Sequence, residues 1–138
     1  MVGASEAISR GRQARKEGNL AAAREHYAVA TTIYREQNDI LACAHTIRHI
    51  ADIYRQEGNP AEAMPLYEEA LELYRGNLAT SILDLANAIR PYALLQEEQG
   101  SLDSAGRLWE EARNLYRSLR IDEGVSECDA HIARLQQS

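Results

Sequence analysis

A pattern of glycine, alanine and aromatic residues occurs three times along the chain. Gly18, Gly58 and Gly100 are 40 and 42 residues apart, and each is followed by an alanine, an aromatic residue and a second alanine at the same offsets. The three sets are Ala23, Tyr27 and Ala30; Ala63, Tyr67 and Ala70; and Ala105, Trp109 and Ala112. Spacings of three and four residues place each set on one face of a helix. Small residues around one large ring indicate helices that pack closely together.

Each set is followed, four residues later, by a tyrosine and an arginine. The pairs are Tyr34–Arg35, Tyr74–Arg75 and Tyr116–Arg117. We expect each tyrosine to pack on the next repeat. We expect each arginine to lie near the C-terminus of its helix, where a cation is favoured.

A second helical stripe precedes each glycine, and it is clearest as Ile47, Ile50, Ala51 and Tyr54. The last segment aligns with this helix without gaps, so that Ile132 and Ala133 match Ile50 and Ala51, and His131 matches His49. Asp129 stands where Ile47 does. A more polar last helix is what the open end of a repeat array needs.

Residues that start and stop helices predict seven of them. Asn59 can cap the helix that begins at Pro60, Asp39 can cap the one that begins at Ile40, and Ser101 is placed in the same way. Gly76 can end a helix that closes at Arg75. No run alternates apolar and polar residues with period two, so we expect no strands. The predicted helices are 4–16, 20–36, 40–56, 60–75, 78–98, 102–118 and 122–136.

This arrangement predicts one all-α domain over residues 1–138. Its helix-turn-helix repeats are expected at about 4–36, 40–75 and 78–118, with a C-terminal capping helix at about 122–136. The pattern resembles the tetratricopeptide repeat, most clearly in "IRHIADIY" followed by "AMPLYEEA". The period is 40–42 residues instead of about 34, and Tyr-Arg replaces the proline that usually follows the second helix. Both departures resemble the longer-helix branch seen in kinesin light chain and in many bacterial regulators.

The resemblance implies a right-handed superhelical solenoid. The first helices of its repeats would line a concave groove, and such a groove usually holds a peptide or a partner helix.

Composition excludes several other classes of protein. The net charge of −6 argues against non-specific binding of nucleic acid. The start of the chain lacks the apolar stretch of a secretory signal, and no stretch approaches the roughly 20 apolar residues of a membrane span. Cys43 and Cys128 are too few for a disulfide framework. We expect a cytoplasmic protein that binds neither nucleic acid nor membranes.

No motif for catalysis stands out. The chain has no glycine-rich nucleotide loop and no Gly-x-Ser-x-Gly. His45 and His49 are four residues apart with Asp52 close by, a spacing that can chelate a metal. One helix supplies only two good ligands, so partly exposed histidines are the favoured interpretation. We therefore predict no enzyme, no cofactor and no metal site.

The candidate binding residues lie on the face of the first helices that is turned away from the core. Their arginines are expected to form one continuous positive surface that binds an acidic or C-terminal peptide or a partner helix. Binding would strengthen at low salt and below about pH 6.5, where the histidines gain charge. Pro91 should kink its helix beside Arg90. The set comprises Arg12, Arg15, Lys16, His45, Arg48, His49, Asp52, Arg55, Asn87 and Arg90.

Three alternatives remain open at this stage. The arginines could pair with Asp52, Glu17 and Glu57 and bind nothing. The chain could be a self-association scaffold that forms a weak homodimer through its N-terminal helix, which has no evident polar cover. It could also be a fragment of a larger regulator.

Overall fold

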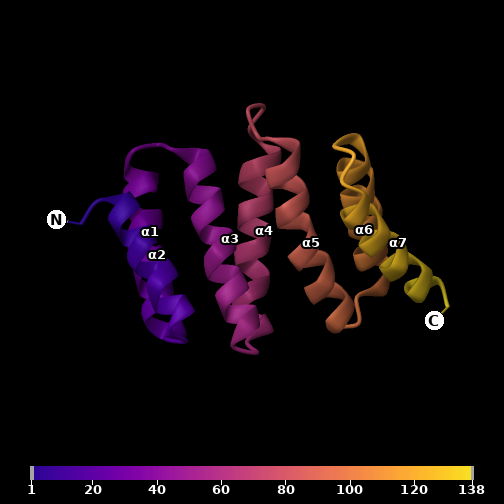
Figure 1. The fold of residues 1–138 in the computed structure, drawn as a ribbon, viewed down its shortest axis with the longest axis horizontal. Helices are drawn as coiled ribbons and strands as arrows, with labels where there is room; N and C mark the ends of the chain where they lie inside the picture. The colour runs from indigo at the N-terminus through magenta and orange to yellow at the C-terminus, as the bar shows by residue number, and fades with distance from the viewer. Residues whose placement is uncertain (1, 138) are drawn as a thin grey trace. The chain divides into compact units, whose positions relative to one another are not determined.

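A computed structural model describes residues 2–137, and these residues form seven α-helices and no strand (Figure 1). This confirms the all-α helical repeat that the sequence predicts. The helices are α1 (Ala4–Lys16), α2 (Leu20–Glu36), α3 (Ile40–Gln56), α4 (Pro60–Arg75), α5 (Ile82–Glu98), α6 (Leu102–Ser118) and α7 (Asp122–Gln136).

The recurrent glycines adopt a conformation that other residues avoid. Gly18, Gly58 and Gly100 have φ values of 82°, 75° and 82°, in the left-handed region where a side chain is strained. Each follows the first helix of its repeat. The turn geometry therefore explains why glycine recurs there.

The predicted caps are largely confirmed. Asn59 Oδ1 accepts a hydrogen bond from the backbone N–H of Glu62 at 3.4 Å, and Asp39 Oδ1 accepts one from Ala42 at 3.3 Å. Ser101 occupies the cap position of α6 but makes no side-chain cap bond. Helix α4 ends at Arg75 with Gly76 as its C-cap, as predicted, and Gly76 has a right-handed φ of −81°.

One predicted helix boundary was wrong. Helix α5 begins at Ile82, not at residue 78. Ser81 has an extended backbone, and its Oγ accepts a hydrogen bond from the N–H of Asp84 at 3.0 Å. This cap starts the helix four residues later than the sequence pattern suggested.

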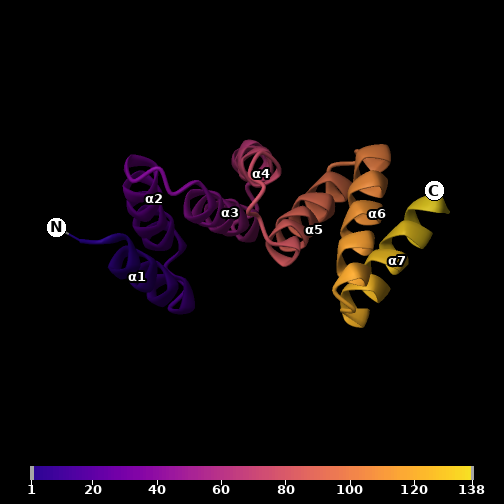
Figure 2. The same cartoon turned by 90° about the horizontal axis from the view of Figure 1, so that it is seen from above.

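The chain divides into two compact units, one ending at Leu78 and the other beginning at Ala79. The first, unit 1, contains α1 to α4. Within it α2 packs against both α1 and α3, and α3 packs against α4 (Figure 2). The alanines and tyrosines of the first two repeat motifs are fully buried between these helices.

The Tyr-Arg pair of the first repeat lies as expected. Tyr34 packs against the buried cluster of Cys43, Ile47 and Ala70 in the next repeat. Arg35 Nη2 donates a hydrogen bond to Glu69 Oε1 at 3.0 Å. The pair thus connects the end of α2 to the second repeat.

The second unit, unit 2, contains α5 to α7. Helix α6 packs against both α5 and α7, and Ala105, Trp109 and Ala112 are buried. Helix α5 continues through Pro91, which is itself buried; a kink there stays a prediction. Asp129 of α7 is exposed, in keeping with a polar capping helix.

Candidate functional site

The predicted binding residues are divided between the two units. Unit 1 holds those of α1 and α3, and unit 2 holds Asn87 and Arg90 of α5. A single positive surface built from all of them therefore stays a prediction. Each unit has its own arrangement of these side chains.

His49 lies inside unit 1. Its ring stacks on Tyr27 of α2, with 5.3 Å between ring centroids and 9° between planes. Its Nε2 lies 3.1 Å from Nε2 of His45. Burial, together with the positive charges of Arg48, Arg15 and Arg12 and with His45, lowers the pKa of His49 to about 3. His49 therefore stays neutral near pH 6.5, and the gain of charge expected from the sequence was wrong for this residue.

Arg48 is neutralised by its own helix. Its Nη1 donates to Asp52 Oδ2 at 2.9 Å, and both side chains are largely buried. Asp52 Oδ1 also accepts the hydroxyl hydrogen bond of Tyr67 in α4 at 2.5 Å. Burial and the Asp52 carboxylate raise the pKa of Tyr67 above its ordinary range, and Arg55, which also hydrogen-bonds Tyr67, opposes this. The network holds α3 to α4.

Three cationic side chains of α1 differ from Arg48 in their lack of a carboxylate partner among the described residues. Arg12 and Lys16 are exposed and have no hydrogen-bond or ion-pair partner among residues 2–137, and Arg15 Nε donates only to the neutral amide of Gln56, at 3.2 Å. Spacings of three and four residues place Arg12, Arg15 and Lys16 on one side of the helix. We call these three residues the α1 cationic face.

Unit 2 uses its two candidate residues to join helices. Arg90 donates two hydrogen bonds to Glu127 of α7, at 2.5 and 2.8 Å, and these bonds hold the pKa of Glu127 below its usual range. Asn87 Oδ1 accepts from the Tyr116 hydroxyl at 2.8 Å. Both residues line a cavity of about 390 Å³. Arg90 is thus already paired within its own unit.

The sequence did not reveal a repeated stack of an aromatic ring on a histidine. The Tyr27–His49 stack of unit 1 recurs in unit 2 as Trp109 on His131, with centroids 4.0 Å apart and 8° between planes. Glu97 Oε1 accepts from Trp109 Nε1 at 3.0 Å and lies 2.9 Å from His131 Nδ1. The alignment of His49 with His131 was the signal for this shared packing role.

The structure shows no group suited to metal chemistry in the part of the chain that it describes. No three histidine, cysteine or acidic side chains between residues 2 and 137 come close enough to hold an ion. Both cysteines are free and buried. Burial raises the pKa of the Cys43 thiol, and it raises that of Cys128 to about 11.

Helices long and apolar enough to cross a lipid bilayer are absent from the described residues.

Comparisons with known proteins agree with the fold. A model of the family described as "SNAP: Soluble NSF attachment protein, SNAP" matches residues 3–120. The structure is similar to crystal structures of BtubC (BKLC) from P. vanneervenii, with a TM-score of 0.71, and of a Podosopora anserina putative kinesin light chain with nearly identical TPR-like repeats, with a TM-score of 0.66. No curated protein sequence matches the chain.

The two structural matches show the fold alone, because sequence identity is 16% and 15%. They cover 97% and 94% of this chain. The chain spans 63% of the length of BtubC and 71% of the kinesin light chain structure. The recurrent helices are therefore TPR-like repeats.

Proposed function

The chain belongs to the soluble NSF attachment protein family, and we propose that it is a non-catalytic module that binds an acidic segment of a partner protein on its α1 cationic face. TPR-like repeats are typical of protein-interaction modules. The family is named for attachment to NSF, which supports a binding role.

The observation that carries the proposal is the state of the α1 cationic face. Arg48 and Arg90 already have carboxylate partners within their units, whereas Arg12, Arg15 and Lys16 make no ion pair among the described residues. Cations gathered on one surface repel one another unless a partner offsets them. A planar guanidinium suits carboxylate oxygens, so an acidic peptide is the matching ligand.

The competing explanation is that these cations only stabilise the end of their helix. Arg15 and Lys16 lie in the last turn of α1, where the helix dipole favours positive charge. Arg12 lies before the last turn, where the helix dipole has little effect. A loss of binding on its substitution therefore favours the binding site over the dipole explanation. Arg10 is a control on the same helix, because it is paired with Glu6 at 2.7 Å.

Titration of a fluorescent, glutamate-rich octapeptide with blocked ends tests the proposal. We expect Arg12→Gln to weaken binding about fivefold at low salt, as loss of one exposed charge pair implies, and Arg10→Gln to leave it unchanged. Binding should also weaken as salt rises, because the screening length falls from roughly 30 Å at 0.01 M to 10 Å at 0.1 M. Equal affinities for both variants, or affinity independent of salt, would refute the site.

Self-association through α1 stays a separate prediction. The prediction of a homodimer rested on an N-terminal helix whose exposed side lacked an evident polar surface. The exposed side chains of α1 include the Glu6–Arg10 ion pair and the hydrogen bond from Gln13 to Glu17 at 2.7 Å. This polar surface weakens the reason to expect a homodimer.

A further inference from the structure

Tyr27 carries a hydroxyl group for which unit 1 supplies no partner. The side chain is only 2% exposed, and its ring stacks on His49. The edge of the ring that faces α1 lies against Gly11, because a Cβ atom added there would come within 3.0 Å of Cε2 and 3.3 Å of Cζ, the carbon that bears the hydroxyl group. This hydroxyl group makes no hydrogen bond to residues 2–137, although a buried tyrosine usually finds one.

The second repeat shows which group is missing. With the repeat period of 40 residues, Tyr27 corresponds to Tyr67 and Arg12 corresponds to Asp52. The hydroxyl group of Tyr67 donates a hydrogen bond to Asp52 Oδ1 at 2.5 Å. The first repeat therefore keeps the tyrosine and has an arginine where the carboxylate would be.

The charges beside the two tyrosines also differ by one carboxylate. In the second repeat, Arg48 bonds Asp52 and Arg55 bonds Tyr67, so two arginines and one aspartate leave a net charge of +1. The corresponding residues of the first repeat are Ile8, Arg12 and Arg15. Two arginines without a carboxylate leave a net charge of +2. One bound carboxylate would give the first repeat the charge balance of the second.

Both arginines of the first repeat have donors to spare. Arg12 is exposed and has no partner among residues 2–137, and Arg15 uses only its Nε, which donates to Gln56 at 3.2 Å. The two Nη atoms of Arg15 therefore remain available. After burial, the charges of both arginines are among those that lower the pKa of His49, which places them near the ring stack.

We propose that the hydroxyl group of Tyr27, together with Arg12 and Arg15, binds one side-chain carboxylate of the partner's acidic segment, in the place that Asp52 takes in the second repeat. We call these three residues the Tyr27 subsite. The inference rests on the proposed function and identifies where one acidic residue of the segment is held. A carboxylate can accept hydrogen bonds from the phenol and from both guanidinium groups.

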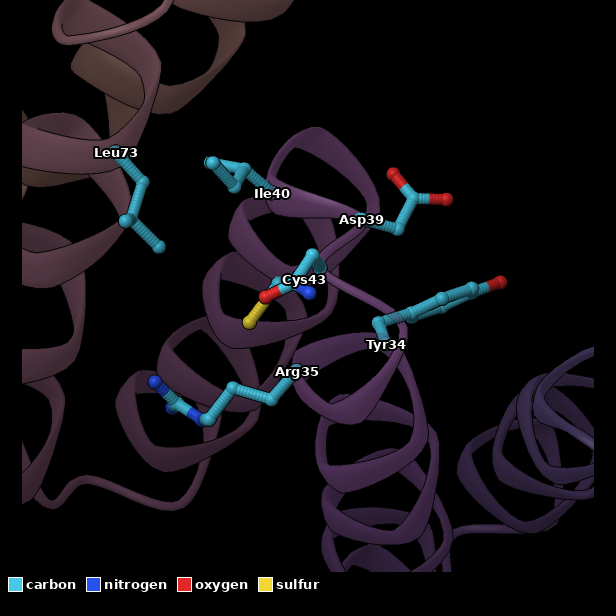
Figure 3. A pocket seen from close by; sticks show the side chains of 7 residues that line it. Tyr34, Arg35, Asp39, Ile40, Cys43 and Leu73 are labelled. Atoms are coloured by element: carbon cyan, nitrogen blue, oxygen red, sulfur yellow. The ribbon is translucent and has the colours of Figure 1, made fainter.

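The glutamate-rich octapeptide with blocked ends tests the subsite in the variant Tyr27→Phe, which loses the hydroxyl group and keeps the ring against His49. We expect binding to weaken about tenfold, because a hydrogen bond to a charged group is lost. Tyr34→Phe is the matched control on the same helix. Figure 3 shows Tyr34 beside the cavity that Cys43 and Leu73 line, in contact with the second repeat. This variant should bind the peptide as the wild type does.

The outcomes separate this inference from the proposed function. Affinity that falls with Arg12→Gln but not with Tyr27→Phe would overturn the Tyr27 subsite and leave the α1 cationic face as the binding site. Absence of binding to the wild type would refute both. A neutral octapeptide with a free C-terminus should not bind. If it alone bound, the subsite would hold a chain terminus, and the proposal would be wrong.

A carboxylate placed within the chain gives a test that needs no peptide. Arg12→Asp puts an aspartate where the second repeat has Asp52, so it should pair with the Tyr27 hydroxyl group and raise the urea midpoint above that of Arg12→Asn. The difference between these two variants should shrink when Tyr27 is also replaced by phenylalanine, as a double-mutant cycle measures. Equal differences with tyrosine and with phenylalanine would mean that the hydroxyl group does not face position 12, and would overturn the proposal.

Discussion

Two glycines inside helices make room for tyrosine rings. A Cβ atom added to Gly11 of α1 would lie 3.0 Å from the ring of Tyr27, and one added to Gly124 of α7 would lie 2.6 Å from the ring of Tyr116. Neither glycine has a left-handed backbone. Close packing between neighbouring helices, and not chain flexibility, is therefore what these two positions require.

Gly124→Ala should accordingly destabilise the protein by about 1–3 kcal/mol, since the new methyl group must displace a buried ring. Gly106→Ala in α6 is the matched control, because a Cβ there meets no atom within 4 Å. It should stabilise the protein by about 0.5–1 kcal/mol through helix propensity. Urea denaturation measures both changes. Shifts of the same sign would show that the contact with Tyr116 is not tight.

The neutral state of His49 predicts a pH dependence of stability. The pKa is lowered to about 3 in the folded protein, whereas an unfolded histidine titrates near about 6.5. As pH falls below about 6.5 the unfolded state takes up a proton that the folded state does not. The free energy of unfolding should therefore decrease, by at most about 1.4 kcal/mol per pH unit from this residue.

Denaturation of the wild type and of His49→Phe between pH 7 and pH 5 checks this expectation. Phenylalanine keeps a ring against Tyr27 and cannot take up a proton. The wild type should lose stability over this range relative to the variant. Parallel profiles would mean that His49 gains charge in the folded state, and the acidic-peptide site would then include it.

At the scale of the helices, local sequence signals predicted most helix boundaries. Contacts between side chains that are far apart in the sequence depend instead on how the helices pack. Asn59 and Asp39 fixed two helix starts because a cap acts within three residues of itself. The Arg48–Asp52 pair was foreseeable for the same reason, since four residues separate its members. The Arg90–Glu127 pair depends on how α5 and α7 approach each other, and the burial of His49 depends on the ring of Tyr27. Neither follows from spacing along the chain.

Ser81 and Ser101 both occupy the cap position of a helix, and comparing them tests how much a cap hydrogen bond contributes to stability. Ser81 makes a cap hydrogen bond at the start of α5, whereas Ser101 makes none at the start of α6. Ser81→Ala should cost about 1 kcal/mol of stability, and Ser101→Ala should cost clearly less. Thermal or urea unfolding of both variants gives the comparison. Equal losses would indicate that Ser101 also caps its helix in solution.

At the scale of the whole molecule, the repeat predicted the architecture better than it predicted the binding site. Seven helices follow from one recurring pattern, because every copy repeats the same turn and the same packing face. A binding site depends on the positions where copies differ. Arg12, which stands in place of Asp52 and has no carboxylate partner among the described residues, is such a difference. Whether such a residue is available to bind a partner could be judged only from the positions of the neighbouring side chains in the structure.

The packing of helices against their sequence neighbours also bears on how the chain acquires its fold. Within each unit, and for the residues that the structure describes, the helix backbones pack against their sequence neighbours, and side chains also join helices two apart, as Arg35–Glu69 joins α2 to α4 and Arg90–Glu127 joins α5 to α7. The backbone interfaces therefore join segments that are close in sequence, which places the chain among the proteins that fold in microseconds to milliseconds. The terminal helices α1 and α7 each pack their backbone against one neighbour, α2 and α6, and are joined to α3 and α5 only through side chains such as Arg15–Gln56 and Arg90–Glu127. They should open and close many times while the other helices of their units stay formed, so the binding surfaces that they carry are accessible only part of the time.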